Sequence, residues 1–213
     1  ILYIVPYAPT PIRTRPYNLV RSLARLGHQV TLATLWENQE EYAGLQKLSQ
    51  EGIQLICEPL TRLQISRNLA EALLKRKPMQ FSYSWNRLLA NKIAEYSDNQ
   101  YQSCDIIQFE HFRGAVYGLS LKRLNKEQAN PIPLVWDSVD NISALFEQAV
   151  AQSKSGFGRW ITRLELPLTR RYESDLRDQF SRLLVTSTAD QAAFESLKPG
   201  RMLNPNKPTK IEV

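Results

Sequence analysis

The sequence predicts an α/β fold, namely a Rossmann-like, doubly wound and mostly parallel sheet of about six to seven strands with helices on both faces. Short apolar runs alternate with segments of helical spacing from one end of the chain to the other. Polar clusters directly follow three of the apolar runs, at the point where a buried parallel strand passes into a helix. In open α/β sheets that edge is where ligands bind.

The first three elements form a βαβ unit. Ile1–Val5 is an apolar run that predicts a buried strand. Thr14 opens a helix whose apolar residues within Leu19–Leu26 keep helical spacing, and Gly27 ends it, as glycine commonly does just past a helix. Gln29–Leu35 is the second strand, so the two strands are expected to be parallel with a right-handed crossover.

The remaining elements follow the same two patterns. Further strands are expected at 53–57, 104–109, 133–136 and 182–186 and from 211 onward. Further helices are expected at 40–50, 66–74, 85–96, 115–124, 144–153, 159–179 and 191–197. Thr188 and Gln191 have capping-box spacing, and Pro167 is expected to bend the longest helix.

Composition places the chain among ordinary globular domains. Its 213 residues suffice for one sizeable core, and no apolar run approaches the roughly 20 residues that span a bilayer. The net charge of +6 favours anionic partners, but no nucleic-acid motif accompanies it. Cys57 and Cys104 lie in or beside strand patterns and are expected to be buried free thiols, which fits a cytoplasmic location. No metal-ligand spacing is present, so no metal site is expected.

The predicted sheet order places the first strand beside the fourth, where the winding reverses. The loops that follow these two strands would then face each other across one crevice. On this arrangement Arg13 and Arg15 approach Glu110, His111 and Arg113.

Three stretches carry a resemblance to a known family. Arg25–Leu32 ends the first helix and opens the second strand, and with the opening strand and its Pro-rich loop it resembles the first βαβ unit of GT-B glycosyltransferases. Asp105–Gly114 resembles the acceptor-side strand and loop of the retaining, family 4-like group. Leu183–Asp190 resembles the strand and helix start that close the same half.

The resemblance implies that residues 1–203 are the N-terminal, acceptor-binding domain and that residues 204–213 begin an interdomain linker. The C-terminal, donor-binding domain is then absent from this chain. The implied function is transfer of a sugar from a nucleotide-sugar donor to a saccharide or lipid-linked acceptor, with retained configuration and without a cofactor or an obligatory metal. The isolated 213-residue domain is expected to have little or no activity.

The candidate catalytic residues are Glu110 and His111. The functional interpretation is that one of them orients the acceptor hydroxyl or stabilises positive charge at the anomeric carbon. A carboxylate suits this task by its charge, and an imidazole by a pKa near neutrality. The alternative is that one of them caps the following helix while the other pairs with Arg113.

Six residues are candidates for binding the acceptor or a phosphate: Arg13, Thr14, Arg15, Arg113, Asp137 and Asn141. Many relatives carry a glycine pair in the first loop, whereas this chain has Pro11–Arg15, so arginine side chains are expected to contact phosphate or carboxylate. The alternatives are solvated loop charges for Arg13 and Arg15, and helix capping for Asp137 and Asn141.

Other interpretations stay open at this stage. Residues 62–92 mix basic and apolar side chains, which is typical either of a helix on an anionic membrane surface or of an ordinary helix packed on the sheet. A peripheral position at the inner face of the membrane would follow from the first. The rival functions are a non-catalytic binding or scaffold module of the same fold and a nucleotide-dependent oxidoreductase. No G-x-G-x-x-G follows the first strand, which disfavours the oxidoreductase.

Overall fold

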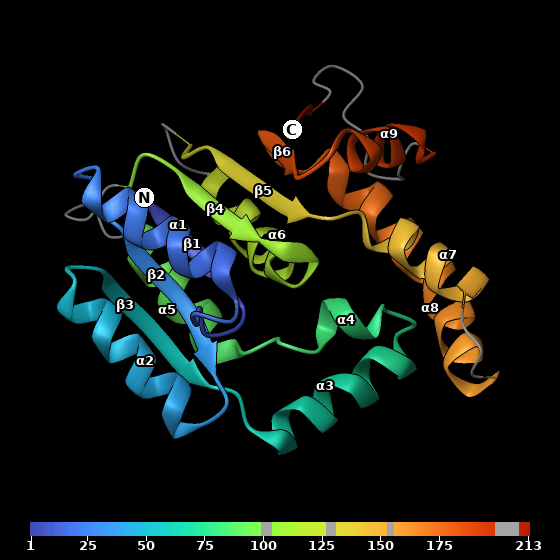
Figure 1. Ribbon diagram of the computed structural model, residues 1–213, viewed down its shortest axis with the longest axis horizontal. Helices are drawn as coiled ribbons and strands as arrows, with labels where there is room; N and C mark the ends of the chain where they lie inside the picture. The colour runs from blue at the N-terminus through green and yellow to red at the C-terminus, as the bar shows by residue number, and fades with distance from the viewer. Residues whose placement is uncertain (99–103, 127–130, 153–155, 199–208) are drawn as a thin grey trace.

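The strands form one parallel sheet in the order β3-β2-β1-β4-β5-β6-β7, so the predicted Rossmann-like α/β fold is confirmed (Figure 1). The computed structural model describes residues 1–98, 104–126, 131–152, 156–198 and 209–213. The strands are β1 (Leu2–Val5), β2 (Thr31–Trp36), β3 (Gln54–Pro59), β4 (Ile107–Glu110), β5 (Leu134–Val139), β6 (Arg182–Val185) and β7 (Lys210–Glu212).

Helices cover both faces of this sheet, as a doubly wound fold requires. Figure 1 shows α1 in front of the sheet and α5 and α6 behind it. The helices are α1 (Thr14–Arg25), α2 (Gln39–Gln50), α3 (Arg62–Leu74), α4 (Met79–Ser82), α5 (Arg87–Asp98), α6 (His111–Lys126), α7 (Ile142–Gln152), α8 (Gly156–Arg177) and α9 (Thr188–Ser196).

Strand β1 divides the core into two apolar clusters. Leu2 and Ile4 pack on the side of α5 and α6, whereas Tyr3 and Val5 pack on the side of α1 and α2. All four side chains are fully buried, because successive residues of a strand point to opposite faces and both faces are covered. Burial of both faces of β1 explains why the start of the sequence is continuously apolar.

The predicted reversal of winding lies between β1 and β4. Ile4 pairs in parallel with Phe109, so the two strands end at the same level of the sheet. Their following helices leave to opposite faces, α1 to one and α6 to the other. A crevice therefore opens at the carboxyl edge between these strands.

An aromatic cluster fixes the other half of the sheet. The ring of Trp136 in β5 packs at a tilt against that of Phe180, with 5.9 Å between the ring centroids. It also meets the ring of Phe194 in α9 edge-on, with 5.5 Å between the centroids. Gly118 of α6 permits this packing, because a Cβ there would lie 2.5 Å from Cε1 of Phe180. The glycine is required here for close approach rather than for a turn.

Several helix starts differ from the prediction. Helix α3 begins at Arg62 rather than at residue 66, since Thr61 caps it by accepting a hydrogen bond from the Gln64 N–H. The short helix α4 was not expected. Helix α9 is capped by Ser187 together with Asp190, so the predicted capping box at Thr188 is wrong.

The carboxyl end of the chain adds an edge strand. Lys210–Glu212, the last part of the segment assigned to the linker, forms β7 and pairs with β6. Residues 199–208, where the linker was predicted to begin, lie outside the described residues. Among the helices that the structure describes, none is long and apolar enough to cross a membrane.

Candidate functional site

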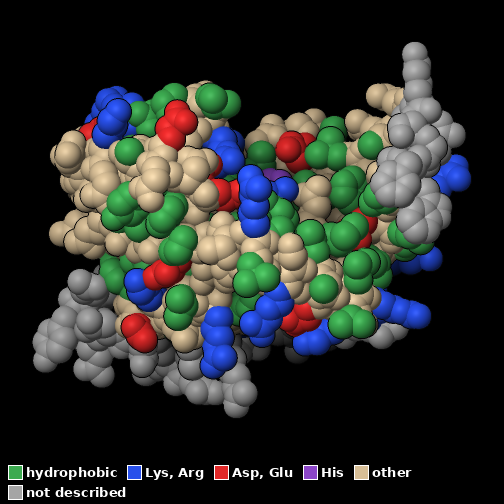
Figure 2. Space-filling view, turned by 90° about the horizontal axis from the view of Figure 1, so that it is seen from below, with side chains coloured by type: hydrophobic (Ala, Val, Ile, Leu, Met, Phe, Trp, Pro, Cys, Tyr) green, Lys and Arg blue, Asp and Glu red, His purple; other side chains and the backbone are tan. Residues whose placement is uncertain are grey.

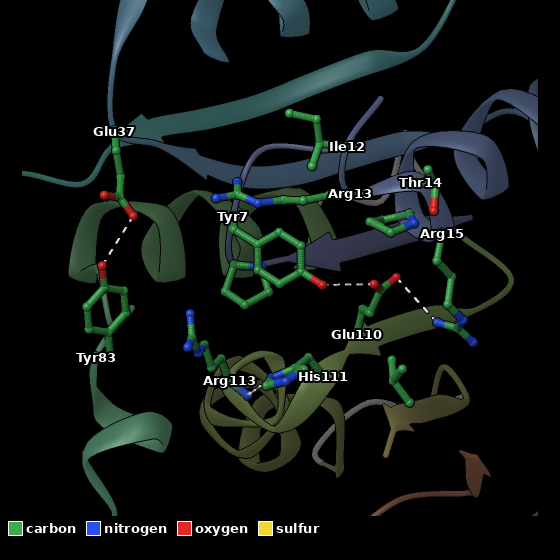
Figure 3. Close-up of a pocket in the computed structure, with 13 residues that line it drawn as sticks. Tyr7, Ile12, Arg13, Thr14, Arg15, Glu37, Tyr83, Glu110, His111 and Arg113 are labelled. Carbon is green, nitrogen blue, oxygen red and sulfur yellow. Dashed lines mark hydrogen bonds and ion pairs between the residues drawn. The ribbon is translucent and has the colours of Figure 1, made fainter. Parts of the chain in front are cut away.

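A cavity of about 430 Å³ lies at the carboxyl edge between β1 and β4, where the sequence predicts a crevice. Figure 2 views the molecule from this side and shows a hollow in which basic, acidic and histidine side chains meet. Figure 3 shows the residues that line it. They are Pro6, Tyr7, Ile12, Arg13, Thr14, Arg15, Pro16, Glu37, Tyr83, Glu110, His111, Arg113 and Val139.

Arg15 contacts acidic side chains from two strands at the floor of the cavity, and so connects α1 with β4 and β5. Its guanidinium, in the first turn of α1, donates two hydrogen bonds of 2.7 and 3.0 Å to the carboxylate of Asp137 in β5. It also lies 3.6 Å from Oε2 of Glu110 at the end of β4. Both acidic residues are 1% exposed. The register pairs Glu110 with Asp137, so the sheet itself holds two buried carboxyl groups side by side.

The environment of Glu110 favours its neutral form. Burial, with a smaller contribution from the charge of Asp137, raises the pKa of Glu110 to about 8. Oε1 accepts a hydrogen bond of 3.0 Å from the Tyr7 hydroxyl, which comes from the loop after β1. Among the described residues, Oε2 has no hydrogen-bond partner, although it is buried and lies 3.6 Å from Arg15. With its raised pKa, this carboxyl group is mostly protonated at pH 7.

His111 opens α6 in a strained backbone conformation. Its φ is +66°, which a residue with a Cβ adopts only when the surrounding structure holds it there. The carbonyl of His111 accepts a hydrogen bond of 3.3 Å from the indole N–H of Trp136, and its Nδ1 accepts one from the Arg113 N–H. The proton of the neutral ring is thus assigned to Nε2.

Burial is the main reason, and the charge of Arg113 a lesser one, that the pKa of His111 falls to about 4. From the sequence, the imidazole of His111 was expected to have a pKa near neutrality, and that expectation is wrong in this buried environment. His111 is neutral across the physiological range, so it suits hydrogen bonding to a ligand rather than proton exchange with it.

A second strained residue stands at the end of β5. Val139 has a φ of +67°, an outlier for a β-branched side chain, and it also lines the cavity. Its carbonyl accepts hydrogen bonds of 2.9 Å from both the N–H and the hydroxyl of Thr186. Strain of this kind clusters at sites where function fixes the backbone.

The basic candidates from the first loop reach the cavity by different routes. Arg13 pairs with Glu41 at 3.0 Å, donates to the carbonyl of Ala8 and lies over the Tyr7 ring at 5.2 Å. Thr14 is an exposed residue at the first position of α1. The alternative of freely solvated loop charges does not describe Arg13 or Arg15, because both hold acidic partners.

Asp137 and Asn141 do not line the cavity. Asp137 lies beneath it in β5, held by Arg15 and by the Gln108 amide at 3.0 Å. Asn141 accepts a hydrogen bond of 2.8 Å from the Ala144 N–H and so caps α7, as the alternative interpretation had it. Buried Glu173 of α8 completes this helix start by accepting hydrogen bonds from the N–H groups of Ile142 and Ser143.

Three cavity residues with polar side chains were not among the sequence candidates. Tyr7 lies in the loop after β1, Glu37 directly follows β2, and Tyr83 follows α4. Glu37 could have been found by the rule that polar residues after parallel strands share one edge. Tyr83 carries no such signal.

No metal centre or disulfide is formed within the described parts of the chain. There, no group of three or more His, Cys, Asp or Glu side chains is placed to hold a metal ion. Cys104 is a buried free thiol, as predicted, while Cys57 is free but only half-buried.

Comparisons with known proteins found no relative of this chain. No family model, no curated protein and no solved structure matches the chain.

Proposed function

We propose that this chain is the acceptor-binding half of a GT-B, family 4-like glycosyltransferase that moves a sugar from a nucleotide-sugar donor to a saccharide or lipid-linked acceptor. The observation that carries the proposal is the 3.0 Å hydrogen bond from Tyr7 to Glu110 inside the cavity. It joins the loop after β1 to the end of β4, two of the three segments that carry the family resemblance. Oε2 of Glu110 makes no hydrogen bond within the described residues, and in this proposal it meets the acceptor.

In this proposal Glu110 handles the proton of the acceptor. A hydroxyl that attacks the anomeric carbon must lose its proton, and a base is most effective when its pKa lies near the working pH. Glu110, with a pKa of about 8, meets that condition once it is ionised. Its Oε2 would accept the proton as the new glycosidic bond forms and the nucleoside diphosphate leaves with the electron pair of the broken bond.

His111 and Arg15 have supporting roles. Neutral His111 would donate a hydrogen bond from Nε2 to a sugar oxygen, while its strained backbone fixes the direction of that bond. Arg15 would position Glu110 by neutralising Asp137 beside it. The donor would be held mainly by a second domain outside this chain, so little or no transfer is expected from the 213 residues alone.

A transferase is favoured over a non-catalytic scaffold of the same fold by two features of the cavity. One is a buried acid, Glu110, whose pKa is raised to about 8, and the other is a pair of strained residues, His111 and Val139, at the ends of adjacent strands. Perturbed acids and strained backbone are typical of catalytic sites. An oxidoreductase remains disfavoured because Pro11–Arg15 occupies the place of a glycine-rich loop.

The direct test uses the full-length protein that contains these residues. It is incubated with radiolabelled UDP-, GDP- and ADP-sugars and with saccharide and lipid extracts as acceptors, and products are separated by chromatography. We expect one donor to be consumed and ¹H NMR to show a new linkage with the configuration of the donor. Absence of any new glycoside across the panel, or a coding region that ends without a second α/β domain, would favour the scaffold.

Helix α3 supports a lipid-linked acceptor. One exposed stripe of this helix contains four residues: Leu63, Arg67, Ala70 and Leu74. Leu63 is 82% exposed and Leu74 is 85% exposed. Basic residues at both ends of the helix accompany the stripe: Arg62, Lys75, Arg76 and Lys77. Figure 1 shows α3 beyond the carboxyl ends of β2 and β3, and the residues that line the cavity lie at the carboxyl edge of the same sheet. We infer that this stripe contacts an anionic bilayer, where leucines enter the interface and basic groups meet headgroups.

This contact predicts sedimentation of the protein with phosphatidylglycerol vesicles and not with phosphatidylcholine vesicles. Changing Leu63 and Leu74 together to serine should lower the bound fraction several-fold, since each removes apolar area from the interface. A double change of the exposed Leu26 and Leu164 to serine is the matched control, because neither residue belongs to α3. Equal loss in both doubles, or no binding to either vesicle, would contradict the contact.

A further inference from the structure

Arg113 is a cation without an anionic partner at the wall of the cavity. Its guanidinium makes no ion pair and donates no hydrogen bond within the described residues, and its buried Nε is unpartnered. It lies over the ring of Tyr83, with the guanidinium carbon 5.0 Å from the ring centroid. A half-buried guanidinium that stacks on an aromatic ring keeps its N–H groups available for a planar, bidentate partner.

The other two arginines of the cavity differ in this respect. Arg15 is matched by Asp137, and Arg13 is matched by Glu41. The acidic side chain on the Arg113 side, Glu37, accepts a hydrogen bond of 3.3 Å from the Tyr83 hydroxyl and forms no ion pair with Arg113. Among the described residues, Arg113 is therefore the cavity arginine that forms no ion pair with an acidic side chain.

Three arginines and two glutamates line the cavity, and one of these glutamates, Glu110, is mostly neutral, so the lining carries a net positive charge. Arg113 lowers the pKa of His111, and Arg113, Arg13 and Arg15 all act to lower the pKa of Tyr7 against the larger effect of its burial. Burial is the main cause of the lowered pKa of Arg113; Arg13 also lowers it, while Tyr83, Tyr7 and Glu37 act to raise it. Figure 3 shows both of these guanidinium groups on the side of the cavity that faces Glu37 and Tyr83. A field of this sign attracts an anion.

We propose that the acceptor carries a phosphate group and that Arg113 binds it while the sugar hydroxyl lies at Glu110. This inference rests on the proposed function, and it names the chemical class of acceptor that the cavity takes. The unpaired guanidinium supplies the hydrogen bonds, and the nearby Arg13 adds charge. Two neighbouring guanidinium groups favour a phosphate, which carries up to two negative charges, over a singly charged sugar carboxylate.

The test is calorimetric titration of the full-length protein at low salt with four probes: glucose 1-phosphate, methyl α-glucoside, glucuronate and inorganic phosphate. Glucose 1-phosphate is expected to bind at least about tenfold more tightly than each of the other three, because only it combines a sugar with a phosphate. Arg113→Gln is expected to weaken its binding roughly 10- to 100-fold, the effect of losing charge-assisted hydrogen bonds.

The matched control is Arg21→Gln, because Arg21 lies on α1 and pairs with Glu51 outside the cavity. It should leave the affinity for glucose 1-phosphate unchanged. Circular dichroism of both variants confirms that they fold, and Arg113→Lys should retain part of the affinity because it keeps the charge.

Four results of the titrations would overturn the assignment. Three are methyl glucoside binding as tightly as glucose 1-phosphate, glucuronate binding more tightly, and inorganic phosphate binding as tightly. The fourth is displacement of the sugar phosphate by a nucleoside diphosphate, which would assign Arg113 to the donor. Sugar transfer to an uncharged acceptor that Arg113→Gln leaves intact would also overturn it, while the proposed function would stand. Absence of all transfer would instead remove the proposed function.

Discussion

Replacing Arg15 with methionine is expected to lower the free energy of unfolding by about 3 kcal/mol, the lower end of the range for removing one partner of a buried ion pair. The change leaves the carboxyl groups of Asp137 and Glu110, both 1% exposed, without the guanidinium that lies between them. We take the lower end because the Arg15 side chain is itself 38% exposed, so water screens part of the interaction. Urea unfolding monitored by circular dichroism measures the effect.

A matched change on the same helix isolates the cause. Arg21→Met removes an ion pair to Glu51 at the surface, and it should leave the urea midpoint almost unchanged. Adding Asp137→Asn to Arg15→Met should restore part of the lost stability, because it removes the buried charge that Arg15→Met leaves without a partner. If Arg15→Met unfolds at the midpoint of the wild type, the network at the floor of the cavity does not stabilise the fold as described.

Under the proposed function, replacing Glu110 with glutamine is expected to reduce the kcat of sugar transfer about 10²- to 10⁴-fold, the usual contribution of a general acid or base. Glutamine keeps the shape and can still accept the hydrogen bond from Tyr7, but it has no proton to exchange. For the wild type, kcat/KM should rise with pH up to about 8, as Glu110 ionises. Glu195→Gln, on exposed α9 surface, is the control and should leave kcat unchanged.

The same substitution changes how stability depends on pH. The pKa of Glu110 rises from 4.5 in the unfolded chain to about 8 in the folded protein, so between these pH values the folded state binds a proton that the unfolded chain has released. The stabilisation is fully present below pH 4.5 and is lost as pH rises through 8. Relative to the wild type, Glu110→Gln should therefore gain about 3 to 5 kcal/mol between pH 4.5 and pH 9. A difference that stays constant with pH would contradict the raised pKa.

The carboxyl edge of the sheet was predictable because strand burial leaves a strong trace in sequence. The run that became β1 is apolar and buried on both faces, β4 carries buried Ile107 and Phe109 on one face, and a polar cluster begins where each strand ends. Those two features suffice to bring Arg15 and Glu110 to one cavity. The order of the strands follows from the handedness of βαβ units, which leaves few alternatives.

The start of α6 was not predictable in the same way. The sequence places the helix from residue 115, whereas it begins at His111, where φ is +66°. A non-glycine residue enters that region only under tertiary constraint, here from Trp136, which is 25 positions away in sequence. The lowered pKa of His111 has the same origin, because burial is decided by packing and not by neighbours in sequence.

Tyr83 and Arg113 illustrate the remaining limit. Arg113 was a candidate because it follows β4, and only the alternative interpretation paired it with Glu110 or His111. In the structure it stacks on Tyr83, which reaches the cavity from the loop after α4, an element without a clear sequence pattern. The proposed anion preference of the cavity depends on a guanidinium without an acidic partner among the described residues, a property that only the packed structure reveals.

The protonation state of Glu110 is measured most directly by a ¹³C NMR titration of the glutamate carboxyl carbons in labelled protein, with Glu110→Gln used to assign the resonance. We expect Glu110 to titrate near pH 8 and an acceptor fragment bound in the cavity to shift its resonance. Titration of Glu110 near 4.5, together with the exposed glutamates, would show that its carboxyl group is ionised at neutral pH and would contradict the site described.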